Sequence, residues 1–358
     1  MKLSDFLRAA ERKSRLWYRK RRFLQNAPNP YGISEQEARK AGRLGFTPEE
    51  YAVYQLDRND PCEYLSEYER ELLRNGAKHY RILFDNKIVF YQFIRNLAPV
   101  NTIYGYRKSG QYVAFEEGWD ADALFDRLME SGAVVCKRIG AGGGDGFQLL
   151  EYRDKRFWIN RSACDADAIK KKLKQDNCLF EAYCCQSRFE NDIWPYAVNT
   201  LRLITIMEPG KQANMILALH RFGVDQYKCV DNAHAGGLIA RIDMERGVLS
   251  GAVCADKTRM TDNNGNLIIY DRHPVTGAAI AGIEIPNWQQ IRGEIEQLHT
   301  SLVFTSVGFI AWDVALTEKG ICIIEGNTSC SMTLMQAFEG MKKKEIGVWM
   351  QKNGYCSK

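Results

Sequence analysis

"FIAWDVALTEKGICIIEGN", residues 309–327, contains two apolar runs separated by Glu318-Lys319-Gly320. A three-residue loop that ends in glycine is a common hairpin connection, with the glycine in the left-handed conformation. The stretch therefore predicts a β-hairpin in which Thr317 pairs with Ile321. This pairing sets the register of the residues farther out on both strands.

Two carboxylates and an amide fall on one face of this predicted hairpin. Stepping four residues outward along each strand pairs Asp313 with Glu325, and the two-residue period places Asn327 on the same face as Glu325. Like charges across a hairpin repel, and each is costly inside an apolar run. A hard divalent cation removes this conflict, so we predict that these three residues are Mg2+ ligands. The alternative is a pair of solvent-facing acids at the rim of a hairpin.

A second stretch, "CKRIGAGGGDGFQLL" at residues 136–150, places Lys137 three residues ahead of a cluster of five glycines. It fits neither the P-loop pattern, because Phe147 follows the last glycine, nor the dinucleotide fingerprint. What remains is a strand, a glycine flap and a second strand. Backbone amides in such a flap can close over phosphates, and Lys137 supplies a charge for the same oxygens. The alternative is a glycine-rich hairpin turn without a ligand.

Composition indicates a reduced protein of the cytoplasm. The chain has 358 residues, of which 45% are apolar and 26% charged, and it contains no apolar stretch of bilayer length. Its first residues lack the apolar segment of a secretory signal. The eleven cysteines never show C-x-x-C spacing, so we expect reduced thiols rather than a disulfide framework or a metal site.

Positive charge is concentrated at the N-terminus. Residues 1–22 contain nine Lys and Arg against two acidic residues, so this segment carries +7 and the rest of the chain −2. Because apolar residues such as Leu7 and Trp17 are interleaved with the charges, the segment is compatible with contact to an anionic membrane surface or an acidic partner. A solvated helix packed on the body is the alternative. We expect no nucleic-acid binding, because the main body is not basic and shows no nucleic-acid module.

The predicted secondary structure changes along the chain. Residues 1–84 are helical in pattern, residues 85–180 mix strands and helices, and strands dominate from about 199 to 325. A Rossmann-like domain is not expected in residues 1–84, because they show no alternating series of strands and helices.

Taken in order, the motifs resemble the ATP-grasp pattern, over most of residues 85–330. They are Lys87 opening a helix, Lys137 with its flap, the linker "LFEAYC", "NTLR" at 199–202, Gly236-Gly237, Asp313, and Glu325 with Asn327. More closely, "NTLRL", "VDNAHAGGLIARID", "HPVTG", "IPNW", "WDVAL" and "IEGN" are similar to the sugar-transfer-associated ATP-grasp proteins, a branch found beside polysaccharide-assembly genes.

The resemblance implies an α+β, two-lobed ATP-grasp fold with the nucleotide between two antiparallel sheets. Residues 1–84 would form a helical, basic N-terminal region in place of a Rossmann-like domain. Residues 85–180 would form the first, smaller lobe. Residues 181–358 would form the second lobe, with the magnesium site and a C-terminal helix.

The resemblance also implies roles for individual residues, with ATP and Mg2+ as cofactors. Lys87 and Lys137 would contact the phosphates, and Arg202 would face the transferred phosphate, which makes Arg202 and Lys137 the candidate catalytic residues. The magnesium ligands would be Asp313, Glu325 and Asn327. The remaining candidate nucleotide contacts are Gly142, Gly143 and Gly144 in the flap and Glu181, Tyr183 and Gln186 near the base and ribose.

The implied function is an ATP-dependent ligase that joins a carboxylate to an amine through an acyl phosphate. Its substrates would be a small-molecule carboxylate and an amine, either free or linked to a sugar. The acceptor would be a uronic acid or an amino acid destined for a surface polysaccharide. Phosphoryl transfer needs mainly positioning and charge neutralisation, and no Ser-His or Cys-His arrangement is visible. Two alternatives remain open: a phosphotransferase acting on a sugar hydroxyl, and a non-catalytic nucleotide-binding scaffold at the inner membrane surface.

Several single features have two interpretations. His220-Arg221 and His273 either face the acceptor or, as isolated histidines near strand ends, are hydrogen-bonded structural residues. Asp231-Asn232 with Gly236-Gly237 is either a loop that clamps substrate or a turn.

Overall fold

The computed structural model describes residues 14, 16–115, 118–140, 144–232, 236–254, 256–262, 266–301 and 303–356. The chain forms two compact units. Unit 1 combines Met1–Lys78 with Ser329–Lys358, and unit 2 is His79–Thr328. This division differs from the three segments expected from the sequence, because the C-terminal helix joins the N-terminal helices instead of the second lobe.

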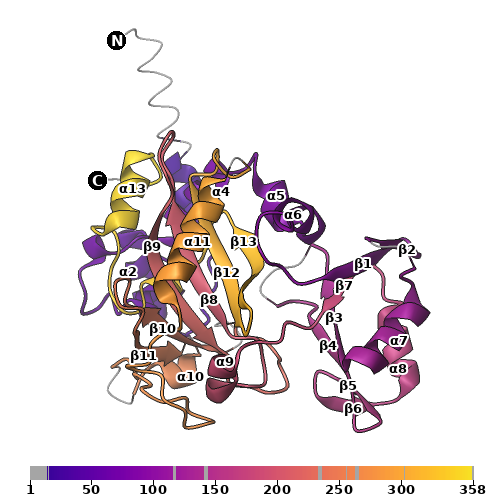
Figure 1. Ribbon diagram of the computed structural model, residues 1–358. Helices are drawn as coiled ribbons and strands as arrows, with labels where there is room; N and C mark the ends of the chain where they lie inside the picture. The colour runs from indigo at the N-terminus through magenta and orange to yellow at the C-terminus, as the bar shows by residue number, and fades with distance from the viewer. Residues whose placement is uncertain are drawn as a thin grey trace. The chain divides into compact units, whose positions relative to one another are not determined.

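Unit 2 contains a seven-stranded antiparallel sheet in the order β2-β1-β7-β3-β4-β5-β6 (Figure 1). One face packs on two helices, α7 (Ala121–Ser131) and α8 (Ala166–Leu173), through a core that includes Leu128, Val134 and Phe180. The strands are β1 (Ile103–Lys108), β2 (Gln111–Ala114), β3 (Ala133–Arg138), β4 (Gln148–Arg153), β5 (Arg156–Ile159), β6 (Ser162–Cys164) and β7 (Cys178–Ala182).

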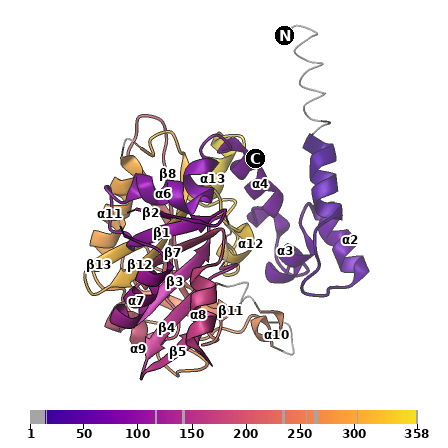
Figure 2. The ribbon, with the colours of Figure 1, turned by 90° about the vertical axis from the view of Figure 1, so that its right-hand side faces the viewer.

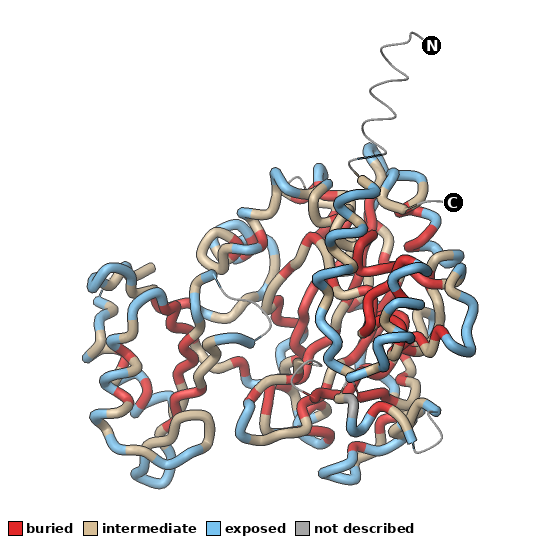
Figure 3. Tube along the Cα trace, turned by 180° about the vertical axis from the view of Figure 1, so that it is seen from behind, coloured by how far each residue is buried: buried red, intermediate tan, exposed pale blue. Residues whose placement is uncertain are grey.

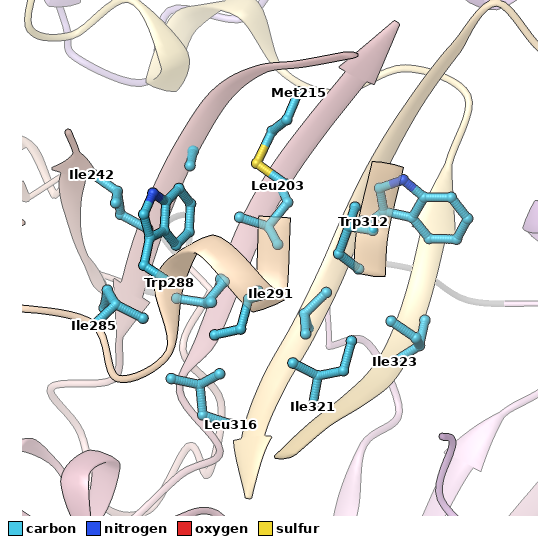
Figure 4. Close-up of a cluster of buried hydrophobic side chains, with 14 of the residues drawn as sticks. Leu203, Met215, Ile242, Ile285, Trp288, Ile291, Trp312, Leu316, Ile321 and Ile323 are labelled. Carbon is cyan, nitrogen blue, oxygen red and sulfur yellow. The ribbon is translucent and has the colours of Figure 1, made fainter. Parts of the chain in front are cut away.

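Unit 2 also contains a six-stranded sheet in the order β11-β10-β9-β8-β12-β13. One of its faces packs on α11 (Trp288–Thr300), whose Trp288 and Ile291 lie against Leu203 and Ile242 of the strands (Figure 4). Many of the buried residues lie along the strands of the two sheets (Figure 3). The strands are β8 (Thr200–Ile206), β9 (Asn214–Phe222), β10 (Leu238–Ile242), β11 (Leu249–Cys254), β12 (Phe309–Thr317) and β13 (Gly320–Asn327).

These two sheets confirm the predicted α+β class with two antiparallel sheets. Short helices complete unit 2: α5 (Arg81–Asp85), α6 (Lys87–Ile94), α9 (Arg188–Ile193) and α10 (Lys257–Met260).

The turn of the β12–β13 hairpin is one residue tighter than predicted. Thr317 pairs with Gly320, whose φ is +110°, and not with Ile321. The predicted turn register is therefore wrong. A regular ladder continued from this turn would have placed Ile324 opposite Asp313.

A β-bulge restores the predicted carboxylate pair. The ladder shifts by one residue at Ile324, so that Asp313 lies opposite Glu325 after all. The shift also changes the face on which Glu325 lies. Ile321 and Ile323 point into the core beneath α11, and strict alternation would have placed Glu325 there as well. The bulge turns the carboxylate to the opposite face, where Asp313 is.

Unit 1 is helical, and its N-terminal helices are shown in Figure 2. Three helix starts carry capping boxes, in which a Ser or Thr side chain and a Glu three residues later satisfy the first backbone amides. The segments are α2 (Glu35–Leu44), α3 (Pro48–Val53), η1 (Pro61–Glu63), α4 (Glu67–Gly76), α12 (Met332–Met335) and α13 (Glu345–Lys352). Among the described residues, no helix is long and apolar enough to span a membrane.

Buried polar side chains connect the two sequence segments of unit 1. The Gln336 amide oxygen accepts from the backbone N–H of Leu65 at 2.8 Å and of Met341 at 3.0 Å. Its Nε2 donates to the Leu65 carbonyl at 2.8 Å and to the Tyr54 hydroxyl at 2.8 Å. Gln336 is 1% exposed, so these groups have no access to water.

We expect Gln336→Leu to destabilise unit 1 by about 2–4 kcal/mol, because it leaves two buried backbone donors without acceptors at about 1–3 kcal/mol each. Hydrogen exchange measured by mass spectrometry would report the change as faster exchange in α4 and α12. Gln351→Leu is the matched control, since the Gln351 side chain is half-buried and makes one long hydrogen bond of 3.5 Å. Equal protection in the two variants would contradict the assignment.

A buried histidine predicts acid sensitivity of unit 2. His299 of α11 donates from Nε2 to the Val307 carbonyl at 2.7 Å, and its Nδ1 lies 2.7 Å from the Thr205 hydroxyl. Burial lowers the pKa of His299 from 6.5 to about 4, although the Val307 carbonyl opposes the shift. The unfolded chain therefore binds this proton more tightly than the folded chain does.

Stability should consequently fall as the pH drops from about 6.5 to about 4, by up to about 3 kcal/mol from this residue. Urea unfolding across this range would measure the slope. His299→Gln should flatten it, whereas His79→Gln, at an exposed position, should leave it unchanged. A parallel pH profile for wild type and His299→Gln would show that another group is responsible.

Candidate nucleotide and phosphate site

The first sheet has two different faces. Val134 and Cys136 of β3 point into the core beneath α7 and α8, so Ala133, Val135 and Lys137 alternate onto the other face. Paired residues share a face, which places Leu149 of β4 and Glu181 of β7 beside Val135. This face carries a small apolar cluster that includes Val135, Leu149 and Cys229.

Lys137 and Glu181 form an ion pair on this face, with Nζ–Oε1 at 2.5 Å. Their side chains are 18% and 8% exposed. Burial disfavours the ammonium, but the adjacent Glu181 carboxylate outweighs it and raises the pKa of Lys137. Lys137 is therefore a fixed positive charge in the protein without ligand. The predicted contact of Lys137 with phosphate stays a prediction that this geometry favours.

Lys87 lies at the first position of α6, where the Asn86 side chain accepts from the backbone N–H of Ile88 and Val89. Burial lowers the pKa of Lys87, and repulsion from Lys137 adds to the shift, while attraction to Glu325 opposes it. These interactions place Lys87, Lys137 and Glu325 close enough to influence one another. The structure thus brings together two predicted phosphate contacts and one predicted metal ligand.

Asp313 lies between two arginines on the face of the second sheet opposite α11. Arg202 on β8 donates to both carboxylate oxygens, Nε to Oδ1 at 2.5 Å and Nη2 to Oδ2 at 3.1 Å. Arg221 on β9 places its Nη2 3.0 Å from Oδ2. Asp313 is 4% exposed, and burial alone would raise its pKa, yet the two guanidinium groups lower it to about 2. Asp313 is ionised throughout the physiological range.

The charged network continues to Asp231. Arg221 lies 3.4 Å from the Asp231 carboxylate and also donates to the Thr200 hydroxyl, which itself donates to Asp231. Burial raises the pKa of Asp231, although Arg221 opposes the shift. The sequence offered Arg221 only as an ambiguous acceptor-facing residue beside His220, and Asp231 only within an ambiguous loop. The available signal was weak: a single arginine at the end of an apolar run.

Glu325 and Asn327 complete the predicted metal site. Burial raises the pKa of Glu325, repulsion from Asp313 adds to it, and Lys87 acts against both. The Asn327 amide donates to Glu325 Oε1 at 3.3 Å. Among the described residues no group of three or more His, Cys, Asp or Glu could hold a metal. Two carboxylates and an amide oxygen suit Mg2+, which binds through one or two carboxylates, and a cation would relieve the repulsion that raises the Glu325 pKa.

A pocket of about 240 Å3 opens beside the linker that follows β7. Tyr183 and Gln186 line it, together with Ala133, Leu149, Glu151 and Arg161. Burial raises the pKa of Tyr183 to about 12, so its hydroxyl is neutral. Both ends of the Gln186 amide are engaged: Nε2 donates to Asn191 Oδ1 at 3.0 Å, and Oε1 accepts from the Asn199 N–H at 2.9 Å. The base and ribose contacts predicted for these residues stay predictions.

The predicted flap is only partly described. Gly142 and Gly143 lie outside the described residues. Gly144 and Gly146 have φ of +82° and +71°, in the region that favours glycine. A Cβ at Gly144 would lie 3.3 Å from Val230 Cγ1, so a larger residue there would press on the loop around Val230.

Both histidines that the sequence left ambiguous are buried and hydrogen-bonded. His220 Nε2 lies 2.8 Å from Glu190 Oε1, with both side chains fully buried. His273 Nε2 donates to the Gly223 carbonyl at 2.8 Å, and its ring stacks on Trp194 at 4.8 Å. These contacts favour the structural interpretation of both residues.

The structure is similar to several solved structures at low identity. An N5-carboxyaminoimidazole ribonucleotide synthetase in complex with ADP is 15% identical, with a TM-score of 0.39 over 69% of this chain and 45% of that chain. D-alanyl-alanine synthetase A from Vibrio cholerae is 12% identical, with a TM-score of 0.43 over 76% of this chain and 66% of that chain. N5-carboxyaminoimidazole synthetase from Staphylococcus aureus, complexed with ADP, is 10% identical, with a TM-score of 0.39 over 70% of this chain and 46% of that chain. The match spans less than two thirds of each of these proteins, and a likeness this distant carries no argument about activity.

No curated protein sequence matches the chain. The model of the sugar-transfer associated ATP-grasp family, by contrast, matches residues 66–346, well over half of the 358 residues. The matched range includes Lys87, Lys137, Arg202 and the β12–β13 hairpin, and it confirms the resemblance inferred from the motifs. The chain therefore belongs to the sugar-transfer associated ATP-grasp family.

Proposed function

We propose that the protein is an ATP-dependent ligase that joins a carboxylate to an amine through an acyl phosphate. The observation that carries the proposal is the convergence of opposite charges: Lys87 and Lys137 interact with Glu325, which lies opposite Asp313 on the neighbouring strand. Cations suited to phosphates therefore lie next to carboxylates suited to a metal. A site that only bound a neutral ligand would need neither.

The chain's own residues would position ATP and neutralise its charge. Lys137, already charged and held by Glu181, would contact the phosphates together with Lys87. Arg202 and Arg221 would place two guanidinium groups where negative charge increases during transfer. Mg2+, held by Asp313, Glu325 and Asn327, would act as a Lewis acid toward the phosphate oxygens. Such positioning supplies most of the catalysis in phosphoryl transfer.

The acceptors follow from the family rather than from the site. We propose that the substrates are a small-molecule carboxylate and an amine. The compounds to test first are the uronic acids and amino acids found in surface polysaccharides. The basic segment 1–22 would bring the protein to an anionic membrane. Of that segment, residues 14 and 16–22 are described, and Trp17 and Tyr18 are each 62% exposed. Exposed aromatic residues beside arginine and lysine suit a membrane interface.

The reaction can be tested with labelled ATP and pooled uronic acids, amino acids and sugars. We expect free phosphate and an amide product in wild type, and a loss of at least about a hundredfold in Asp313→Asn, which removes a charge that the metal and two arginines share. Asp126→Asn, at an exposed position on α7, is the matched control and should turn over normally. A phosphorylated sugar would indicate the phosphotransferase instead, and absence of any product with bound ATP would indicate the scaffold.

Lys137→Met should weaken ATP binding about ten- to a hundredfold, the factor that corresponds to a charge-assisted contact of about 1.5–3 kcal/mol. Calorimetry with a non-hydrolysable ATP analogue would measure it separately from turnover. Lys171→Met, on the exposed side of α8, should bind the analogue like wild type. If both variants bind equally well, the phosphates lie elsewhere.

A further inference from the structure

Arg221 reaches Asp313 across an intervening strand. Arg221 lies on β9 and Asp313 on β12, and β8 lies between these two strands. Two strand spacings amount to about 10 Å. Arg221 Nη2 nevertheless lies 3.0 Å from Asp313 Oδ2. A long side chain that is held in one conformation loses rotamer entropy, and further contacts along the side chain offset this cost.

Two other side chains supply such contacts to Arg221. Thr200 lies directly opposite Arg221 on the neighbouring strand, so the two side chains share a face. Arg221 Nε donates to the Thr200 hydroxyl at 3.0 Å and lies 3.4 Å from Asp231 Oδ2. The Thr200 hydroxyl in turn donates to the same Oδ2. Thr200 and Asp231 are both buried, so the guanidinium is held where water does not compete for it.

A close backbone contact fixes the chain around Asp231. Gly237, immediately before β10, donates its N–H to the Asn232 carbonyl at 3.1 Å. A Cβ on Gly237 would lie 2.4 Å from the Asp231 carbonyl oxygen and 2.9 Å from that of Phe222, which is too close for any side chain. Glycine at this position therefore allows the approach that brings Asp231 to Arg221.

The two carboxylate partners of Arg221 have different surroundings. Asp313 lies opposite Glu325 and is a proposed metal ligand, so its carboxylate oxygens have a second use. Asp231 is not one of the proposed ligands, and its Oδ2 is shared between Thr200 and Arg221. Asp231 can therefore keep hold of Arg221 when Asp313 serves the metal.

We infer that Asp231 is a positioning residue that, together with Thr200, holds Arg221 aimed at the reacting phosphate. The inference rests on the proposed function, in which Arg221 faces negative charge that increases during transfer. A supporting shell of this kind keeps a long side chain in its productive geometry. Asp231 then acts through Arg221 and does not touch the substrate.

NMR spectra of protein labelled with 15N-arginine test the positioning without turnover. An Nε–H held by Thr200 and Asp231 should give a separate signal that exchanges slowly with water, and Arg221→Lys assigns this signal by removing it. We expect Asp231→Asn and Thr200→Val each to shift the signal and to speed its exchange at least about tenfold, because each removes one of the two contacts. An unchanged signal in both variants would overturn the inference.

A double-mutant cycle then tests whether Asp231 acts through Arg221. Asp231→Asn should lower kcat about ten- to a hundredfold and leave the affinity for a non-hydrolysable ATP analogue close to that of wild type. In an Arg221→Met background the same change should have little further effect. A full additional loss in that background would show that Asp231 acts independently, against the inference.

Asp225→Asn is the matched control. It makes the same chemical change in the same connection between β9 and β10, at a half-buried residue whose side chain accepts from the Tyr227 N–H. Asparagine can accept this bond as well, so kcat and the Arg221 signal should stay as in wild type.

The outcomes separate this inference from the proposed function. If wild type turns over with none of the acceptors, the proposed function fails, whereas the Arg221 signal still decides whether Asp231 holds the side chain. If wild type is active and Asp231→Asn keeps both its kcat and the signal, the function stands and the positioning role is overturned. Should Asp231→Asn fail to fold, Thr200→Val, which changes no charge, gives the same two readouts.

Discussion

The buried carboxylate of Asp313 is the constraint around which the second sheet is arranged. A carboxylate that is 4% exposed requires compensating charge, and Asp313 obtains it from Arg202 and Arg221. The two arginines come from β8 and β9, the first and second neighbours of β12. The strand order is therefore also an electrostatic requirement. With a different strand order, Asp313 would lose these two guanidinium partners.

In both sheets the two faces have different roles. Each has one face closed by helices and apolar side chains, and the charged residues of the site lie on the other face. This separation allows charges such as Lys137 and Asp313 to be buried next to partners and not among aliphatic side chains. A stable core and a charged site can then share one set of strands, because alternate residues serve the two purposes.

The sequence allowed prediction of contacts between residues that are close in the chain. The Asp313–Glu325 pair followed from one hairpin, and its prediction was confirmed even though the turn register was wrong. The network through Arg221 and Asp231 could not be predicted, because it depends on which strands become neighbours across the sheet. The packing of the C-terminal segment with the N-terminal helices could not be predicted either. It depends on contacts between residues far apart in the sequence, such as that of Gln336 with Leu65.

The bulge at Ile324 bears on how the hairpin finds its register. If β13 formed a plain ladder from the same turn, Ile324 would lie opposite Asp313, and Glu325 would join Ile321 and Ile323 on the apolar face. That arrangement would bury the Glu325 carboxylate without a compensating charge against α11. The misaligned hairpin is therefore unfavourable when α11 covers the apolar face. The carboxylates that we assign to the metal site would in this way also help to specify the register of the hairpin.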